Sequence, residues 1–398
     1  MAKTRAKRKR DADEITMSNA GSRWLILPPE ILRMILQYLA TDKETLRACS
    51  QTAQEFRHVA LSFFGRHLSV NDANRVKECA QLITRGAFQH VRSLDLGVVK
   101  KSATLEENWK HYIVILGSFA RFRTLGRLWL SEVPFTFLQK NNLRETITLL
   151  GSAVTELGLY GCHFSSYEEM ISFIRTFPLC NFLFIRDCVT GGEAIGGNAL
   201  AGLPEHKLVV QDLQLSASSS RNLLIDVSNL IKDADLDIGS LTSLVCDVGT
   251  SERTQCVAAA VSTSPVKHFQ LACSEPGGFQ VFVNHLSKWS LKTLTIGPQF
   301  RETNTVFWVE AFKGLPPLPL VNNVTVVYHY PKYGDFNIDF WEYLERILSR
   351  RDLFPALKSM HVRCSFGSHR LERMLRWQLD RSLRSIKTRG ITVARQAI

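Results

Sequence analysis

The stretch VTELGLYGCHF, Val154 to Phe164, has apolar residues at its first, fourth and sixth positions. The same spacing, apolar-x-x-apolar-x-apolar, recurs many times beyond residue 88. Alternation of apolar and polar residues predicts a β-strand, so each copy marks one expected strand. The copies are VRSLDL at 91, LGRLWL at 125, VTELGL at 154, LCNFLF at 179, VQDLQL at 210, LTSLVC at 241, VKHFQL at 266, LKTLTI at 291, VNNVTV at 321, LKSMHV at 357 and a weaker LRSIKT at 383.

The segments between these copies have helical spacing, and successive copies are ~25 to ~36 residues apart, as in repeat proteins. Prolines stand after a predicted helix and just before a predicted strand at Pro178, Pro265, Pro319 and Pro355. This order predicts an irregular α/β solenoid of about ten repeats over residues 71–398. A doubly wound sheet also alternates strands and helices, but no strand here is followed by a phosphate-binding glycine turn.

The segment WLILPPEILRMILQYLA, residues 24–40, opens a predicted helical domain at 23–70. Pro-Pro-Glu is a favourable helix start. A second helix starts at TDKE with Asp42 or Thr41 as its cap, and a third is expected over residues 53–68. On a helical wheel the apolar residues of 31–39 cover about 200°, whereas one packing face needs roughly 100°. We therefore expect a second apolar contact, either with the rest of the chain or with another protein.

The head of the chain resembles the F-box, in particular that of fungal F-box proteins, and the repeats are similar to the leucine-rich repeats that accompany it. The residues that carry the F-box resemblance are Leu27-Pro28-Pro29-Glu30-Ile31-Leu32, Ile35-Leu36, Leu39, Leu46, Ser50, Phe56-Arg57 and Val59-Ala60. Phe56 replaces the usual tryptophan, and DKET at 42–45 replaces the usual Asp-Leu pair. Only Val154–Phe164 fits the long repeat consensus, with Cys162 at the Asn/Cys position.

The resemblance implies a short three-helix F-box followed by a leucine-rich-repeat-like α/β solenoid. An F-box binds the Skp adaptor of a cullin–RING (SCF-type) ubiquitin ligase, and the domain after it holds a protein substrate for ubiquitination. The residues expected in the adaptor's groove are Leu27, Pro28, Ile31, Leu32, Ile35 and Leu36. Those expected to hold the three helices together and seat them on the first repeats are Leu39, Leu46, Phe56, Val59 and Phe63. The alternative for all of them is packing within this chain alone.

The x residues of the repeats are expected on the concave side, the usual binding face of a solenoid. The predicted substrate-binding residues are Arg92, Arg127, Trp129, Tyr160, Lys267, His268, Lys292 and Lys358, with His361 and Arg384 also on this side. Acidic members are fewer, namely Asp95, Glu156 and Asp212. The hypothesis is a face that prefers an acidic or phosphorylated protein segment, with aromatic anchors. The alternative is an ordinary mixed solvent face.

The net charge of +12 divides into two parts. Residues 3–10, KTRAKRKR, carry six positive charges within a basic arm at 1–22 that is expected to be disordered. The arm is read as a nuclear localisation signal or as a solubilising tail. The remaining charge is spread too thinly for a dedicated nucleic-acid surface. Nine cysteines without a CxxC pair indicate a reducing compartment, nucleus or cytoplasm, and no zinc site.

The sequence contains none of the catalytic or nucleotide-binding motifs GxSxG, HExxH, GxxxxGK[ST] and GxGxxG. No window is long and apolar enough to span a membrane. We therefore expect a non-enzymatic receptor without cofactor, metal or small-molecule substrate. Two other functions remain open: a leucine-rich-repeat scaffold outside any ubiquitin ligase, and a nuclear nucleic-acid-binding protein that uses the basic arm.

Overall fold

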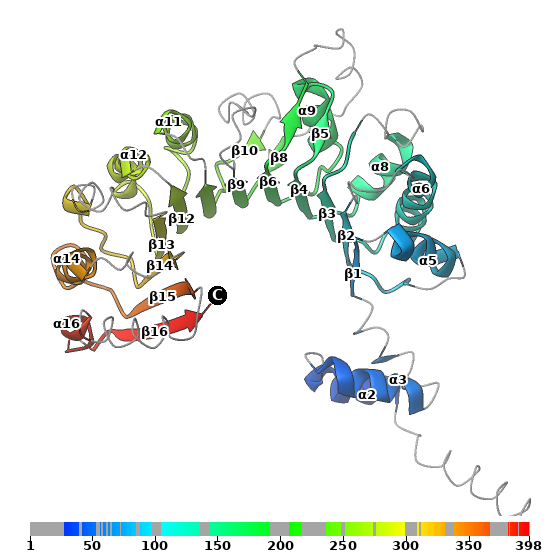
Figure 1. Cartoon of the computed structure of the whole chain (residues 1–398), viewed down its shortest axis with the longest axis horizontal. Coiled ribbons are helices and arrows are strands. Elements are labelled where there is room, and N and C mark those ends of the chain that lie inside the picture. The colour runs from blue at the N-terminus through cyan, green and yellow to red at the C-terminus, as the bar shows by residue number, and fades with distance from the viewer. Residues whose placement is uncertain are drawn as a thin grey trace, which may run out of the picture.

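The computed structural model shows a mixed α/β chain built around a large curved parallel sheet (Figure 1). It describes residues 28–39, 42–52, 56, 59–60, 63, 66–71, 73–84, 88–97, 105–135, 144–191, 207–216, 236–247, 251–273, 276–298, 309, 312–330, 338–366, 381, 383–388 and 390–397. The basic arm and Leu27 lie outside these residues, so the predictions for them stay predictions.

Twelve strands form the main sheet, and every neighbouring pair is parallel. They are β1 (His67–Val70), β2 (Ser93–Gly97), β3 (Arg127–Ser131), β4 (Glu156–Tyr160), β6 (Phe182–Arg186), β9 (Asp212–Ser216), β11 (Ser243–Asp247), β12 (His268–Cys273), β13 (Thr293–Pro298), β14 (Asn323–Tyr330), β15 (Ser359–Phe366) and β16 (Thr392–Ala397). Two short parallel pairs accompany it, β5 (His163–Phe164) with β7 (Val189–Thr190), and β8 (Leu208–Val209) with β10 (Leu236–Asp237). The main strands follow one another in chain order.

The helices of the repeats lie on the outside of the arc, and the strands line its inside (Figure 1). They are α5 (Ala73–Thr84), α6 (Leu105–Phe122), α8 (Arg144–Gly151), α9 (Tyr167–Arg175), α11 (Ser251–Ala260), α12 (Pro276–Leu286), α14 (Ile338–Leu348) and α16 (Arg384–Thr388). A doubly wound sheet reverses its strand order and carries helices on both faces. The described strands show no reversal, so that alternative is wrong for this chain.

Each strand of the sheet buries every second residue against the helices. In β3, Leu128 and Leu130 are buried, whereas Arg127, Trp129 and Ser131 on the other side are partly exposed. We call this second side the inner face. Because the strands pair in register, the buried residues stack in rows along the arc, one of which is Leu94, Leu128, Leu157, Leu183, Leu213, Leu244, Phe269, Leu294, Val324 and Met360.

A ladder of hydrogen bonds runs along the edge of the sheet where the strands begin. The carbonyl of Arg92 accepts the amides of Gly126 and Arg127, both at 2.9 Å, and the carbonyl of Lys267 likewise accepts those of Lys292 and Thr293. Backbone groups at this edge are thus satisfied by the next repeat. The backbone of the residue before each strand is therefore held at this edge.

One repeat differs from the predicted frame by a single residue. The sequence pattern LCNFLF placed Leu179, Phe182 and Phe184 in the core, but Leu179 is 56% exposed. The buried residues are Cys180, Leu183 and Ile185. A shift of one residue moves every side chain of a strand to the other face, so Phe182 and Phe184 lie on the inner face. In the corrected frame, Cys188 stands where Cys162 stands in its own repeat.

The two ends of the sheet also differ from the predictions. The weak copy at 383 is a helix, α16, because Leu383 and Ile386 are buried at helical spacing and Gly390 turns the chain with a φ of 77°. The last strand, β16, follows this glycine. At the other end His67–Val70 forms β1, although the third helix was expected to reach Leu68 and the helical domain residue 70.

The N-terminal helices are α2 (Pro29–Tyr38) and α3 (Lys43–Thr52), and residues 56, 59, 60 and 63 are also helical. They have a small core of their own, separate from the core of the sheet. It contains Leu36, Leu46 and Ala60, with Leu39, Cys49, Phe56, Val59 and Phe63 packed against it. Asp42 caps α3, accepting the Thr45 amide at 3.0 Å and the Thr45 hydroxyl at 2.6 Å.

Candidate functional site

Helix α2 has two apolar sides, of which only one is covered. Leu32 and Leu36 are each 1% exposed, and Leu36 belongs to the small core. The other side consists of Ile31, Met34, Ile35 and Tyr38, with exposed fractions of 41%, 58%, 44% and 87%. These four residues follow the i, i+3, i+4, i+7 spacing of one helix face. We call them the open face of α2.

The predicted adaptor-binding residues separate between the two sides of α2. Ile31 and Ile35 lie on the open face, and Pro28 is exposed at its start. Leu32 and Leu36 do not belong to the open face, because they are buried and helix geometry turns them about 100° or more from Ile31. Both side chains are buried within the chain itself. Two open-face residues were missing from the predicted set, Met34 and Tyr38, although the wheel placed them beside Ile31 and Ile35.

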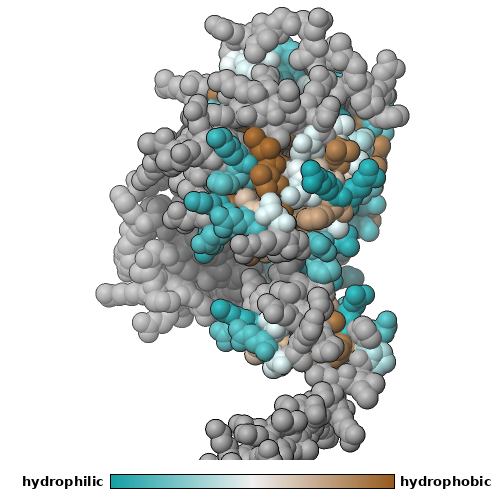
Figure 2. All heavy atoms as spheres, turned by 90° about the vertical axis from the view of Figure 1, so that its right-hand side faces the viewer, coloured by the Kyte–Doolittle hydropathy of each residue, from teal (hydrophilic) through white to brown (hydrophobic). Residues whose placement is uncertain are grey.

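Apolar side chains are also exposed on the outer helices (Figure 2). Hydrophobic groups lie at the surface over the helices of the first repeats, and another lies below them on the N-terminal helices. Among the described side chains of the outer helices, the large apolar ones that are exposed are Leu82 on α5, Val114 on α6 and Leu149 on α8. Each comes from a different helix, whereas the open face of α2 gathers four such residues on a single helix. The open face is therefore the more concentrated apolar surface.

Large aromatic side chains meet on the inner face of β3, β4 and β6. The ring of Trp129 stacks on Phe184 with centroids 4.8 Å apart and lies 6.5 Å from the ring of Phe182. Trp129 and Phe184 belong to strands that are not adjacent, with Gly158 of β4 between them. A Cβ atom at Gly158 would lie 2.5 Å from Trp129 Cδ2. Glycine at this position is what lets the tryptophan ring lie across β4.

Two arginines lie over aromatic rings of this cluster. The Arg127 guanidinium is 4.6 Å from the Trp129 ring centroid, and its Nε is 3.8 Å from Glu156 Oε2. Arg186 lies 5.4 Å from the Tyr160 ring centroid. We call Arg127, Trp129, Glu156, Tyr160, Phe182, Phe184 and Arg186 the aromatic patch. Arginine, tryptophan and tyrosine are the residue types that dominate binding energy in protein interfaces.

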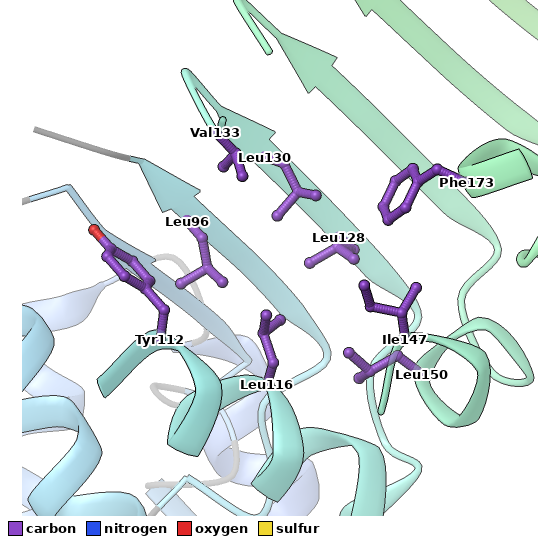
Figure 3. Close-up of a pocket in the computed structure, with 9 residues that line it drawn as sticks. All are labelled: Leu96, Tyr112, Leu116, Leu128, Leu130, Val133, Ile147, Leu150 and Phe173. Carbon is purple, nitrogen blue, oxygen red and sulfur yellow. The ribbon is translucent and has the colours of Figure 1, made fainter. Parts of the chain in front are cut away.

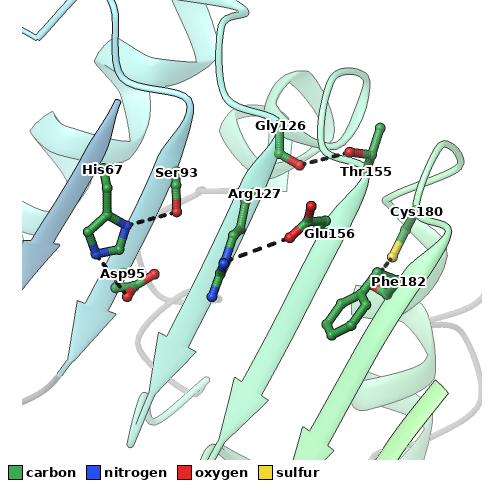
Figure 4. Close-up of polar contacts among 9 residues, drawn as sticks. All are labelled: His67, Ser93, Asp95, Gly126, Arg127, Thr155, Glu156, Cys180 and Phe182. Atoms are coloured by element: carbon green, nitrogen blue, oxygen red, sulfur yellow. Dashed lines mark hydrogen bonds and ion pairs between the residues drawn. The ribbon is translucent and has the colours of Figure 1, made fainter. Parts of the chain in front are cut away.

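Figure 4 shows the polar contacts at one side of the patch, where the strands begin. His67 Nδ1 lies 3.0 Å from Ser93 Oγ, and its Nε2 lies 3.4 Å from Asp95 Oδ2. The Arg127–Glu156 pair follows on the next two strands, and the Phe182 ring lies beyond it on β6. Polar and charged side chains on β1 to β4 therefore lead up to the Phe182 ring on β6.

The predicted substrate-binding residues fall into two groups. Arg127, Trp129 and Tyr160 are brought together in the aromatic patch, and His268 lies on the inner face of β12, with its Nδ1 2.8 Å from Thr293 Oγ1. The second group is Arg92, Lys267, Lys292 and Lys358, which are not part of the patch. Each of these residues precedes its strand and belongs to the edge ladder. Arg384 lies in α16.

Phe182, Phe184 and Arg186 were not predicted as site residues. The spacing of LCNFLF predicts that the two phenylalanines lie in the core, because this copy starts at Leu179, one residue before the buried Cys180. The signal that finds the correct frame is Cys188, which matches Cys162 at the eighth residue after the first apolar position. Arg186 then aligns with Tyr160 in the strand register.

A small apolar cavity of about 20 Å³ lies between the sheet and the outer helices (Figure 3). Its walls are Leu96, Tyr112, Leu116, Leu128, Leu130, Val133, Ile147, Leu150 and Phe173. The Tyr112 hydroxyl donates to the Gly97 carbonyl at 2.5 Å, and burial raises the Tyr112 pKa to about 12. The space is about that of one water molecule and lacks convergent polar groups, so it is a packing gap and not a ligand pocket.

Two buried thiols donate hydrogen bonds to backbone carbonyls of the sheet. Cys162 donates to the Leu130 carbonyl at 3.3 Å and Cys188 to the Leu159 carbonyl at 3.5 Å, so each thiol binds the preceding repeat. Burial raises the pKa of Cys162 and raises that of Cys180 to about 12. These two thiols are therefore protonated at neutral pH and are not activated nucleophiles. Within the described ranges, no three His, Cys, Asp or Glu side chains gather as metal ligands, and no helix has the length and apolarity to cross a membrane.

Comparison with known proteins adds no further assignment. The sequence matches no protein-family model, and no curated protein matches it. The open face of α2 and the aromatic patch are the two surfaces that bear on the function of this chain.

Proposed function

We propose that this chain is a non-catalytic substrate receptor of an SCF-type cullin–RING ubiquitin ligase. In this proposal the N-terminal helices are an F-box that binds the Skp adaptor. The sheet with its outer helices is an irregular leucine-rich-repeat-like solenoid that holds a protein substrate. Both parts act by binding, and the ubiquitin-transfer chemistry belongs to other subunits of the ligase.

The open face of α2 is the observation that carries the proposal. A helix that packs on one side needs one apolar stripe, and α2 has this stripe in Leu32 and Leu36. Ile31, Met34 and Ile35 form a second stripe, and burying such a side chain fully is worth about 1.5–3 kcal/mol. An apolar helix face of i, i+3, i+4, i+7 spacing is the element that enters a hydrophobic groove of a partner. The F-box resemblance of the same residues supports an adaptor as that partner.

The arrangement of the repeats supports the solenoid part of the proposal. Consecutive strands are neighbours throughout the described sheet, and the helices lie outside it. Each repeat therefore contacts mainly the one before and the one after, as in other repeat proteins. The thiols of Cys162 and Cys188 occupy equivalent positions and make equivalent bonds to the preceding repeat. This is the position that the leucine-rich-repeat consensus gives to asparagine or cysteine.

The test is a pull-down of purified Skp adaptor with the full chain. Wild type is compared with the double variant Ile31→Glu/Ile35→Glu, which places two carboxylates on the open face. Arg33→Glu is the matched control, because it changes the net charge by the same two units at an exposed position of α2 off the open face. We expect adaptor capture by wild type and by the control, and loss of capture with the double variant.

Two outcomes would contradict the proposal. One is a wild-type chain that captures no adaptor. The other is a double variant that captures as much as wild type, since the open face would then not be the contact. Hydrogen exchange of the α2 peptide in each variant shows whether the helix is retained. Both isoleucines are exposed, so we expect exchange close to that of wild type.

A further inference from the structure

In two places on the aromatic patch an arginine of the chain lies over an aromatic ring while its charge is matched by a nearby carboxylate. At the first, Arg127 lies over Trp129 with Glu156 beside it. A cation over an aromatic ring is attracted to the negative face of the ring. The carboxylate adds a Coulomb attraction from the side.

The second place has the same composition. Arg186 lies over Tyr160, and its Nε is 3.5 Å from Asp187 Oδ2. Arg186 and Tyr160 are register partners on neighbouring strands. The same arrangement thus occurs twice on the inner face. In each case an aromatic ring and a neighbouring carboxylate together bind a guanidinium group.

A third ring and carboxylate lie side by side without a cation. Phe182 pairs in register with Glu156 on one side and with Asp212 on the other. Neighbouring strands are about 4.8 Å apart, so the Asp212 carboxylate is within reach of a group that lies on the Phe182 ring. Both side chains are partly exposed. Within the described part of the chain, no cation lies over this ring and no group hydrogen-bonds or pairs with the Asp212 side chain.

The charges around Phe182 favour a cation there. Asp212 and Glu156 flank the ring, and Arg127 neutralises only one of the two. Asp95, a third inner-face carboxylate, lies two strands from Glu156 on β2. The lysines expected on this face lie on the edge of the sheet instead. An acidic segment would place its carboxylates next to those of the protein, at a cost in Coulomb energy.

We infer that Phe182 and Asp212 form a binding site for the side chain of an arginine or lysine from a protein segment laid along the inner face. The basic side chain stacks its aliphatic stem and charge on the Phe182 ring and pairs with Asp212. The site identifies the substrate class of the proposed receptor, which is a protein segment with an exposed basic residue. To that extent the inference rests on the proposed function. The binding itself needs no adaptor.

The test measures binding of two fluorescein-labelled peptides to the full chain by anisotropy. One peptide alternates glycine with arginine, and the other alternates glycine with glutamate. The net charge of +12 attracts the glutamate peptide and repels the arginine peptide, so saturable arginine-peptide binding does not arise from net charge. We expect that binding to weaken about threefold with Asp212→Asn, since exposed ion pairs are modest in energy.

Phe182→Leu keeps an apolar side chain but removes the ring, and we expect a loss of about threefold for this variant too. Glu342→Gln removes a carboxylate from the outer helix α14 and is the matched control, with binding equal to wild type. The inference is overturned if the wild-type chain does not bind the arginine peptide, or if Asp212→Asn binds it as well as wild type does. It is also overturned if Glu342→Gln weakens binding as much as Asp212→Asn.

The two proposals fail independently. Ile31→Glu/Ile35→Glu is expected to bind the arginine peptide like wild type, because α2 belongs to a separate core. Asp212→Asn is expected to capture the adaptor like wild type. Loss of peptide binding with intact adaptor capture therefore contradicts the inference alone, and the reverse result contradicts the proposed ligase function alone.

Discussion

Replacing Gly158 by alanine tests whether the Trp129 ring is packed across β4. The added Cβ would lie 2.5, 2.8 and 2.9 Å from three atoms of the indole ring, closer than real Cβ contacts permit. The ring has to leave its place against Phe184 and Arg127. An aromatic pair is worth about 0.5–1.5 kcal/mol and an exposed cation–π contact about 0.5–1 kcal/mol. Alanine itself stabilises a strand by about 0.5 kcal/mol relative to glycine, which offsets part of this loss. The expected net destabilisation of Gly158→Ala is about 0.5–2 kcal/mol.

The assay is hydrogen exchange of the β4 peptide, because exchange reports local opening within an array of many repeats. A loss of about 0.5–2 kcal/mol corresponds to exchange about two- to thirtyfold faster. The decisive comparison is a double-mutant cycle with Trp129→Ala. Without the indole ring there is nothing for the Cβ to displace, so Gly158→Ala should be neutral or slightly protective in that background. Equal destabilisation in both backgrounds would refute the packing described for this ring.

Three further predictions concern the reading frame, the two sides of α2 and the cap of α3. Leu183→Asp should abolish folding of its repeat, whereas Leu179→Asp should leave the circular dichroism melting curve unchanged, because only Leu183 is buried. Leu36→Ala should lower the stability of α2 by about 2–5 kcal/mol and Ile35→Ala by under about 1 kcal/mol, as read from exchange of the α2 peptide. Hydrogen bonds from the first turn of α3 lower the pKa of Asp42 below its ordinary value of 3.8. The ionised Asp42 cap therefore stabilises α3 fully above pH 3.8, and this stabilisation is lost as the pH falls through the lowered pKa. In wild type, the exchange protection of α3 should decrease as the pH is lowered below about 4. In Asp42→Asn, the protection should not change with pH in this range.

Much of the sheet could be predicted from the sequence because its repeats obey a local rule. In the copy at 125, Leu125, Leu128 and Leu130 are buried as the spacing predicts. Alternation within a strand is a property of the extended backbone, so it is visible in the sequence without any knowledge of neighbours. Helices α2 and α3 were likewise predictable from their start signals and spacing, and Asp42, one of the two predicted cap residues, caps α3.

The candidate sites were less predictable because they depend on which of two apolar sides meets the rest of the chain. The wheel of α2 shows an apolar arc, but only contact with residues such as Leu46 and Ala60 makes Leu36 core and leaves Ile35 open. The positions of Lys267, Lys292 and Lys358 at the edge of the sheet were also not predictable from the sequence pattern. Spacing alone does not show that the residue before a strand is held by the ladder of the next repeat.

The sequence by itself determined the strand–helix alternation, the order of the repeats and the apolar surplus of α2, because each follows from periodicity within a short segment. Tertiary structure decided the frame of β6, which the apolar spacing of the strand leaves open, and through it the aromatic patch. Leu179, Phe182 and Phe184 fit the repeat spacing as well as Cys180, Leu183 and Ile185 do. The choice between two frames one residue apart is made by pairing with β4 and β9, which fixes the side chains that meet the helices and leaves the two phenylalanines on the inner face.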